Sequence, residues 1–162
     1  KYYSSSKKLA EQIGLGESFN KFVNRFEVNA NNKDSLKRVV DQAYAATDTY
    51  LRSNERLKTA SQILAGSWIE GQHITVNLLK DAERTEQNAK LYDRVWEQRL
   101  YLENITGIFN EFKDDAESAK IKKELESLLE IYKEPKDAKA IDKDLLVRLS
   151  NNLARVRNSI VK

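Results

Sequence analysis

Helix-breaking residues are scarce in this chain, since one proline and five glycines occur among its 162 residues. Proline and glycine are the residues that most often end helices and form the tight turns between strands. Apolar side chains also recur every 3.6 residues in five segments, as they do along one face of an α-helix. The sequence therefore predicts an all-α fold without a β-sheet, either an antiparallel bundle or a stack of helical hairpins.

The expected order of elements is one or two short N-terminal helices followed by about five long ones. Residues 1–6 are expected to form a flexible leader, and residues 7–162 a single helical domain, which is an ordinary length for one hydrophobic core. The short helices are predicted over residues 7–13 and around Phe19, Phe22, Val23 and Phe26. The long helices are predicted at about 33–53, 57–80, 85–113, 114–134 and 141–161.

Apolar stripes predict which face of each long helix is buried. In the 57–80 helix the expected inward residues are Ala60, Ile63, Leu64, Trp68, Gly71, Ile74 and Leu78. In the 85–113 helix they are Val95, Leu102, Ile105, Phe109 and Phe112. The last helix has the most regular stripe, made of Leu145, Leu149, Leu153, Val156 and Ile160. Asp114 and Glu117 have the spacing of a capping box, so we expect the 114–134 helix to begin there.

The charge pattern argues against nucleic acid and membrane-spanning roles. The 28 basic and 25 acidic residues leave a net charge of +3, and the two signs alternate along the helices, as on solvated faces. Arg148 and Arg155 share one face of the last helix, but no aromatic side chain lies nearby to stack on bases. Nucleic acid is therefore an unlikely partner.

No segment approaches the roughly 18 to 20 apolar residues that a transmembrane helix needs.

One local sequence stands out, Ala-Gly-Ser-Trp-Ile-Glu-Gly at residues 65–71, inside the predicted 57–80 helix. Two glycines within a helix are disfavoured by roughly 2 kcal/mol relative to alanine, so something must offset them. The structural interpretation is a close helix contact beside Trp68. The functional interpretation is a ligand surface formed by Gly66, Trp68, Glu70, Gly71 and His73. The third interpretation is a kink in the helix that has no other role.

Residues for catalysis or metal binding are few. Glu70 and His73 have the Glu-x-x-His spacing of di-iron carboxylate bundles, but such a site needs two of these pairs and His73 is the only histidine. With no cysteine in the chain, the usual zinc ligand sets are also excluded. Neither a Gly-x-Ser-x-Gly elbow nor a P-loop occurs. We therefore expect no catalytic residues, no metal site and no cofactor, and a protein that is not an enzyme.

Three segments carry a family resemblance: Asn-Lys-Asp-Ser-Leu at 32–36, Thr-Asp-Thr-Tyr-Leu at 47–51 and the glycine-tryptophan element at 65–71. Together they resemble a group of uncharacterised all-helical proteins from Bacteroidetes, over about the first half of the chain. Gln72 and His73 depart from the apolar residue that often follows the second glycine in that group. The resemblance implies an exported, lipid-anchored protein of the periplasm or cell surface, with residues 1–6 as the remnant of a tether behind a removed signal and a lipid-bearing cysteine.

These observations leave three functions open. The first is a non-enzymatic helical domain that binds or scaffolds an unknown protein or small molecule at the bacterial cell envelope. The second is a small-molecule-binding bundle with a pocket around Trp68, Glu70 and His73. The third is a cytoplasmic partner-binding module. The first two differ in whether those three side chains line one pocket or lie in a filled core.

Overall fold

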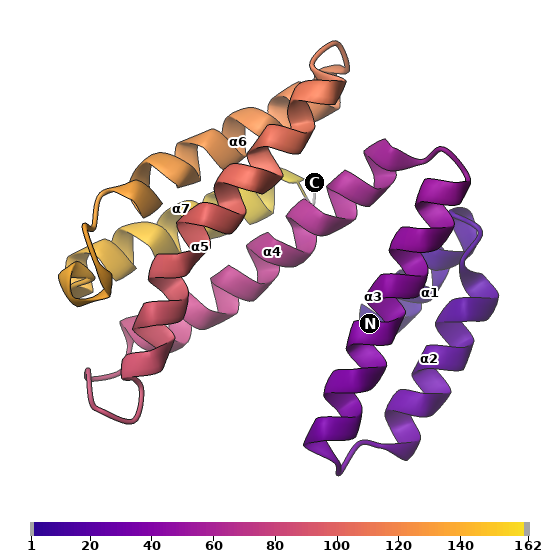
Figure 1. The fold of residues 1–162 in the computed structure, drawn as a ribbon, viewed down its shortest axis with the longest axis horizontal. Helices are drawn as coiled ribbons and strands as arrows, with labels where there is room; N and C mark the ends of the chain where they lie inside the picture. The colour runs from indigo at the N-terminus through magenta and orange to yellow at the C-terminus, as the bar shows by residue number, and fades with distance from the viewer. Residues whose placement is uncertain (1, 161–162) are drawn as a thin grey trace. The chain divides into compact units, whose positions relative to one another are not determined.

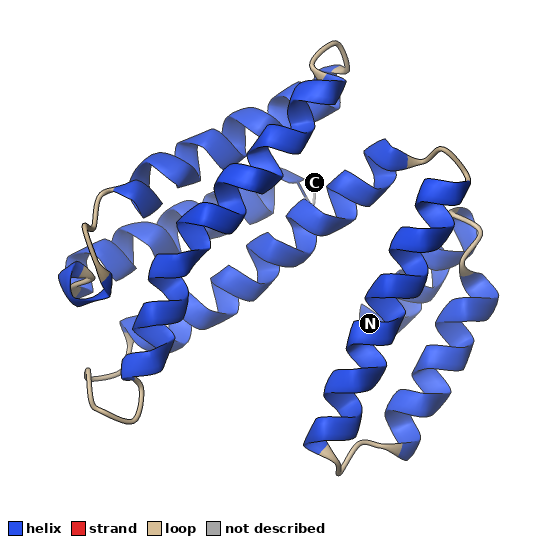
Figure 2. Cartoon of the chain, in the orientation of Figure 1, coloured by secondary structure: helices blue, strands red, loops and turns tan. Residues whose placement is uncertain are grey.

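The structure is a computed structural model, and it describes residues 2–160. Over that range the chain forms seven α-helices and two short 3-10 helices and contains no strand, as Figures 1 and 2 show. The predicted all-α fold class is therefore confirmed. The chain divides into two compact units, residues 1–60 and residues 61–162, which we describe in turn.

The first unit contains three helices, α1 (Tyr2–Gln12), α2 (Gly16–Val28) and α3 (Lys33–Ser53), and each packs against the next. Gly14 makes the turn after α1 at a φ of +81°, where a side chain would also collide with the hydroxyl of Tyr50. The side chain of Asn32 caps α3 by accepting a hydrogen bond from the Ser35 amide. The buried apolar residues described in this unit are Leu15, Val39 and Leu51.

The second unit is a four-helix arrangement of antiparallel chain neighbours (Figure 1). It is made of α4 (Leu57–Lys80), α5 (Ala89–Ile108), α6 (Ala116–Lys133) and α7 (Lys143–Ile160), with 3-10 turns at Phe109–Phe112 and Ala138–Ala140. Its largest fully buried side chains are Tyr132, Phe109, Leu79, Leu102, Leu125, Leu128, Leu146, Leu149 and Leu153. Trp68 and Trp96 pack against this core from its edge.

Carboxylates fix where the last two helices begin. Asp115 caps α6, because its side chain accepts from the Ser118 amide at 2.9 Å and from the Ser118 hydroxyl at 2.8 Å. The cap is one residue later than the predicted one at Asp114. Asp142 does the same for α7 through the amide of Leu145, at 2.8 Å.

Arg84, in the loop between α4 and α5, binds the connection between α6 and α7. Its guanidinium donates to the carbonyl oxygens of Ala138 at 3.1 Å and Ile141 at 3.2 Å. The same group lies 4.1 Å from the centre of the Tyr92 ring, which gives a cation–π contact. One cation therefore joins two connections more than 50 residues apart in sequence.

Two expectations differ from the structure. The expected leader, residues 1–6, is helical from Tyr2 onward, because α1 begins there instead of at Lys7, and Lys1 lies outside the described residues. The boundary between the two compact units falls after Ala60, inside helix α4, where no proline or glycine marks it, and the single helical domain stays a prediction. The 85–113 helix is also shorter, since it starts at Ala89 and passes into a 3-10 turn at Phe109.

The predicted inward face of α4 is wrong. The buried residues of this helix are Ser61, Ala65, Ile69, Gln72, Val76 and Leu79. Leu64, Ile74 and Leu78, expected to be buried, are 44%, 53% and 66% exposed. Both faces of α4 carry apolar side chains, so the periodicity alone does not decide which one is buried.

Candidate functional site

Trp68 lies on the side of α4 that faces α5 and the core. Its indole nitrogen donates to the side-chain oxygen of Gln98 on α5 at 2.9 Å. Its ring centre is 5.5 Å from that of Tyr132, a buried residue of α6, and the two planes are tilted by 60°. Trp68 is half-buried and its one polar group is satisfied, so it mainly fills space at the edge of the core.

Glu70 lies on the side of α4 that faces α7. Both of its carboxylate oxygens accept hydrogen bonds from the Arg157 guanidinium. Oε2 accepts from Nε, and Oε1 accepts from Nη2 at 3.3 Å. The hydrogen bond from Arg157 lowers the pKa of Glu70 below its ordinary value, more strongly than partial burial raises it. The Glu70 side chain is about half exposed, so water screens the pair and its contribution to stability is modest.

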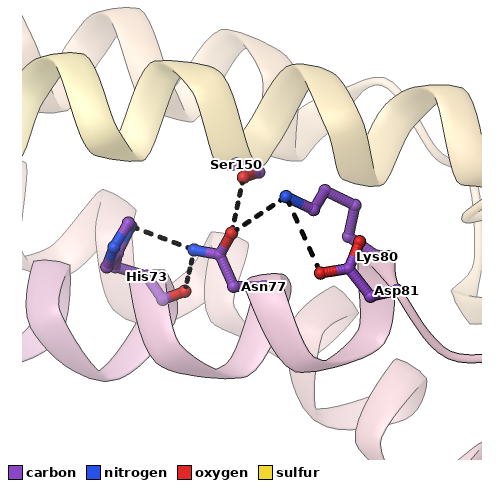
Figure 3. A network of polar contacts seen from close by, with 5 residues as sticks. All are labelled: His73, Asn77, Lys80, Asp81 and Ser150. Atoms are coloured by element: carbon purple, nitrogen blue, oxygen red, sulfur yellow. Dashed lines mark hydrogen bonds and ion pairs between the residues drawn. The ribbon is translucent and has the colours of Figure 1, made fainter.

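His73 belongs to a polar network between α4 and α7, drawn in Figure 3. The amide nitrogen of Asn77 lies 3.2 Å from Nδ1 of His73 and donates to the His73 carbonyl at 2.6 Å. The amide oxygen of Asn77 accepts from the hydroxyl of Ser150 at 2.9 Å and from Lys80 at 3.2 Å. Asn77 thus lies between the serine and the histidine, whereas nucleophilic catalysis needs the hydroxyl bonded directly to its base.

The five residues of the predicted ligand surface therefore do not converge. Trp68 is bonded to α5, whereas Glu70 and His73 lie toward α7, because residues two positions apart are rotated by about 200° around a helix. Glu70 and His73 do share a side, as their spacing of three predicts.

The two glycines of the motif are open to their surroundings. A Cβ atom built on Gly66 or on Gly71 would meet no neighbouring atom within 4 Å, apart from its own helix and chain neighbours. The interpretation that these glycines let a neighbouring helix of the second unit approach is therefore wrong. Within that unit, nothing in the packing of the described residues offsets their low helix propensity.

We expect Gly66→Ala to raise the stability of the second unit by about 1 kcal/mol. Alanine restricts the unfolded chain and suits the helix better, and the open position accepts the methyl group without strain. The increase should appear as a higher urea midpoint with an unchanged slope. Gly14→Ala is the opposing control in the first unit, where its positive φ and the Tyr50 hydroxyl both reject a side chain, so the midpoint of that unit should fall. A lower midpoint for Gly66→Ala would contradict the open site.

An uncharged apolar stripe runs along the outer side of α4 within the second unit. It consists of Leu64, Ser67, Gly71, Ile74 and Leu78, and we call it the α4 outer stripe. Glu70 is the only charged residue between Lys58 and Lys80, and it is bonded to Arg157. Sequence reasoning placed four of these five residues in the core, so it missed the stripe as a surface; the missing charges were the available signal.

Two further surface features of the second unit are polar. An open groove of about 520 Å³ lies along α5, the Phe109–Phe112 turn and α6, and its acidic residues are Glu103, Glu126 and Glu130. Glu103 pairs with Lys133 and Glu126 with Lys122. On α7, the side chains of Arg148, Arg155 and Arg157 each pair with a glutamate, which reduces the positive charge available to phosphates.

Neither metal ligands nor membrane spans emerge from the described residues. Among them, no group of three or more histidine, cysteine, aspartate or glutamate residues is arranged to hold a metal ion. No helix within the described range is both long enough and apolar enough to cross a membrane. No family model, curated protein or solved structure matches this chain.

Proposed function

We propose that this chain is a non-enzymatic helical binding or scaffolding domain that engages a protein partner through the α4 outer stripe. The observation that carries the proposal is the exposure of Leu64, Ile74 and Leu78 along one uncharged side of a helix. Contiguous exposed apolar side chains on a helix are typical of protein interaction sites. Ile74 and Leu78 are four residues apart and Leu64 lies ten residues before Ile74, so all three fall on one side of the helix, as the anchors of a helix that binds another helix or lies in a groove do.

A small-molecule pocket around Trp68, Glu70 and His73 receives less support. The side chains of these residues are bonded within the bundle, to Gln98, Arg157 and Asn77. A ligand would have to replace those bonds from two different sides of α4. A protein partner on the outer stripe displaces only water from apolar groups, which is favourable.

The proposed location is the periplasm or cell surface of a bacterium, and it rests on the resemblance of residues 32–36, 47–51 and 65–71 to exported proteins. Reading the gene upstream of Lys1 tests it, because a signal peptide followed by a lipid-bearing cysteine would be encoded there. A coding region that continues upstream without a signal peptide would favour the cytoplasmic partner-binding module, which could use the same stripe.

We expect a photoreactive side chain at position 78 to capture a protein partner in the source bacterium. A benzophenone amino acid replaces Leu78 in one variant and Leu100 in the matched control, since both are exposed leucines, of α4 and α5. If the partner binds through the outer stripe, we expect at least about 5-fold more cross-linked product from position 78 than from position 100. The group at position 78 would then lie against the partner with water excluded, as anchors at an interface do. Equal yields, or none from either position, would contradict the proposal.

A further inference from the structure

We infer that the α4 outer stripe binds a second copy of this chain, as an antiparallel helix pair that crosses at Gly71. This inference rests on the proposed function of the stripe as a binding surface and names its partner. Three features carry it: the symmetry of the stripe about Gly71, the open space over that glycine, and the absence of charge along the stripe.

The two leucines of the stripe are placed symmetrically about Gly71. Leu64 lies seven positions before it and Leu78 seven positions after it. A two-fold axis at Gly71 brings residues equally far before and after that position together, so Leu64 meets the partner's Leu78 at both ends of the contact. Nearer the axis, Ser67 lies four positions before Gly71 and Ile74 three positions after it, so the small serine comes within one residue of the larger Ile74 of the partner subunit. The stripe is thus complementary to itself in this orientation.

Gly71 allows the two helices to come close at the crossing point. It is exposed, and a Cβ atom there would have no neighbouring atom within 4 Å. Glycine is a poor helix former at an exposed position unless something benefits from the missing side chain. Two helices that cross at a glycine can pack at the short end of the usual 8–10 Å between axes, with the flanking leucines in contact.

Charge favours a second copy and the antiparallel direction. The stripe carries no charged side chain, so two copies of it meet without like-charge repulsion, which often prevents a surface from binding itself. The antiparallel direction also sets the positive end of each helix dipole beside the negative end of the other. A parallel pair would place Ser67 opposite Ser67 and leave the small residues without a large partner.

The contact area makes the predicted dimer weak and reversible. The 20 residues from Ser61 to Lys80 span about 30 Å, and a helix is about 10 Å wide, so two stripes cover roughly 600 Å² in projection. Stable dimers bury about 1,200–2,000 Å², whereas transient ones bury less. We therefore expect a dissociation constant in the range of about 10 μM to 1 mM, which sedimentation equilibrium over that range of protein concentrations measures.

Single cysteines test the geometry, because residues 1–162 contain no cysteine that would interfere. Under mild oxidation, Gly71→Cys is expected to form a disulfide-linked dimer at least about 10-fold faster than Gly66→Cys or Gly107→Cys, since proximity raises the local thiol concentration. The two controls are matched, because both replace helical glycines with the same open space around Cβ. Mixing Leu64→Cys with Leu78→Cys should give mainly the mixed dimer.

Three results would overturn the inference. They are a monomer at every concentration, equal disulfide-linking rates at positions 66, 71 and 107, or preferred linking of position 64 to 64 and of 78 to 78.

Ile74→Glu should abolish the concentration dependence of dimer formation while leaving the melting temperature of the monomer unchanged, because Ile74 is half exposed. In the photo-cross-linking experiment, a product of twice the chain's mass supports a second copy. A product of any other mass retains the binding function of the stripe and rejects the second copy.

Discussion

Leu102→Ala is expected to lower the free energy of unfolding of the second unit by about 2–5 kcal/mol. Leu102 is fully buried in α5, and its removal leaves a cavity that the other side chains of the core fill only in part. Trp68 and Trp96 are the only tryptophans of the chain, and both pack against this core. Urea unfolding followed by tryptophan fluorescence therefore reports on the second unit.

Leu100→Ala is the matched control, because it makes the same chemical change two residues earlier in the same helix. Leu100 is 51% exposed and is not part of the buried core. We expect a change of less than about 1 kcal/mol, since half of its surface already contacts water and no cavity forms. Similar losses for the two variants would show that α5 presents a different face to the core.

Tyr132→Phe is expected to destabilise the second unit by about 1–3 kcal/mol. The Tyr132 hydroxyl donates to the side-chain oxygen of Gln72 at 3.0 Å, and both residues are buried. Loss of the hydroxyl leaves the Gln72 oxygen without this donor, and an unsatisfied buried acceptor is more costly than the hydrogen bond itself is favourable. Equilibrium unfolding in urea measures the change.

A double-mutant cycle isolates the hydrogen bond. In a Gln72→Leu background, Tyr132→Phe should lose less stability than it does in the natural protein, because no acceptor is left unsatisfied. If the two substitutions add without coupling, the hydrogen bond does not contribute to stability.

The pH dependence of the free energy of unfolding tests the burial of the Tyr132 hydroxyl independently. Burial raises the pKa of the Tyr132 hydroxyl well above its ordinary value, whereas in the unfolded chain it ionises near pH 10. The native state therefore keeps a proton that the unfolded state releases, and stability falls as the pH rises through about 10. Tyr132→Phe should lose less stability than the natural protein between about pH 9 and pH 11.

The helices of the fold could be predicted more securely than their faces. The 33–53 and 57–80 helices were placed at the residues where α3 and α4 begin and end, because caps and turn residues mark their ends. The face of α7 was also correct for Leu145, Leu149, Leu153 and Val156, since charged residues fill its other side. On α4 both faces carry apolar side chains, and helical periodicity alone does not decide which of the two is buried.

In the candidate site, the sequence predicts which side chains share a helix side but not which residues of other helices they contact. That Trp68 and Glu70 lie on different sides of α4 follows from their spacing alone, whereas their partners Gln98 and Arg157 come from helices 30 and 87 residues away. Such long-range pairs depend on how the bundle closes. The spacing of Glu70 and His73 correctly placed them together, but no sequence rule indicated that Asn77 would separate His73 from Ser150.

The contacts of Arg84 bear on how the end of the bundle opens locally. The loop after α4 and the connection before α7 share this one guanidinium, which also covers the ring of Tyr92. Release of the arginine from either connection removes the donors that the carbonyl oxygens of Ala138 and Ile141 use. We therefore expect the two connections to fluctuate as one cooperative segment, so that amide hydrogens on both exchange with solvent at a common rate although they are far apart in the chain.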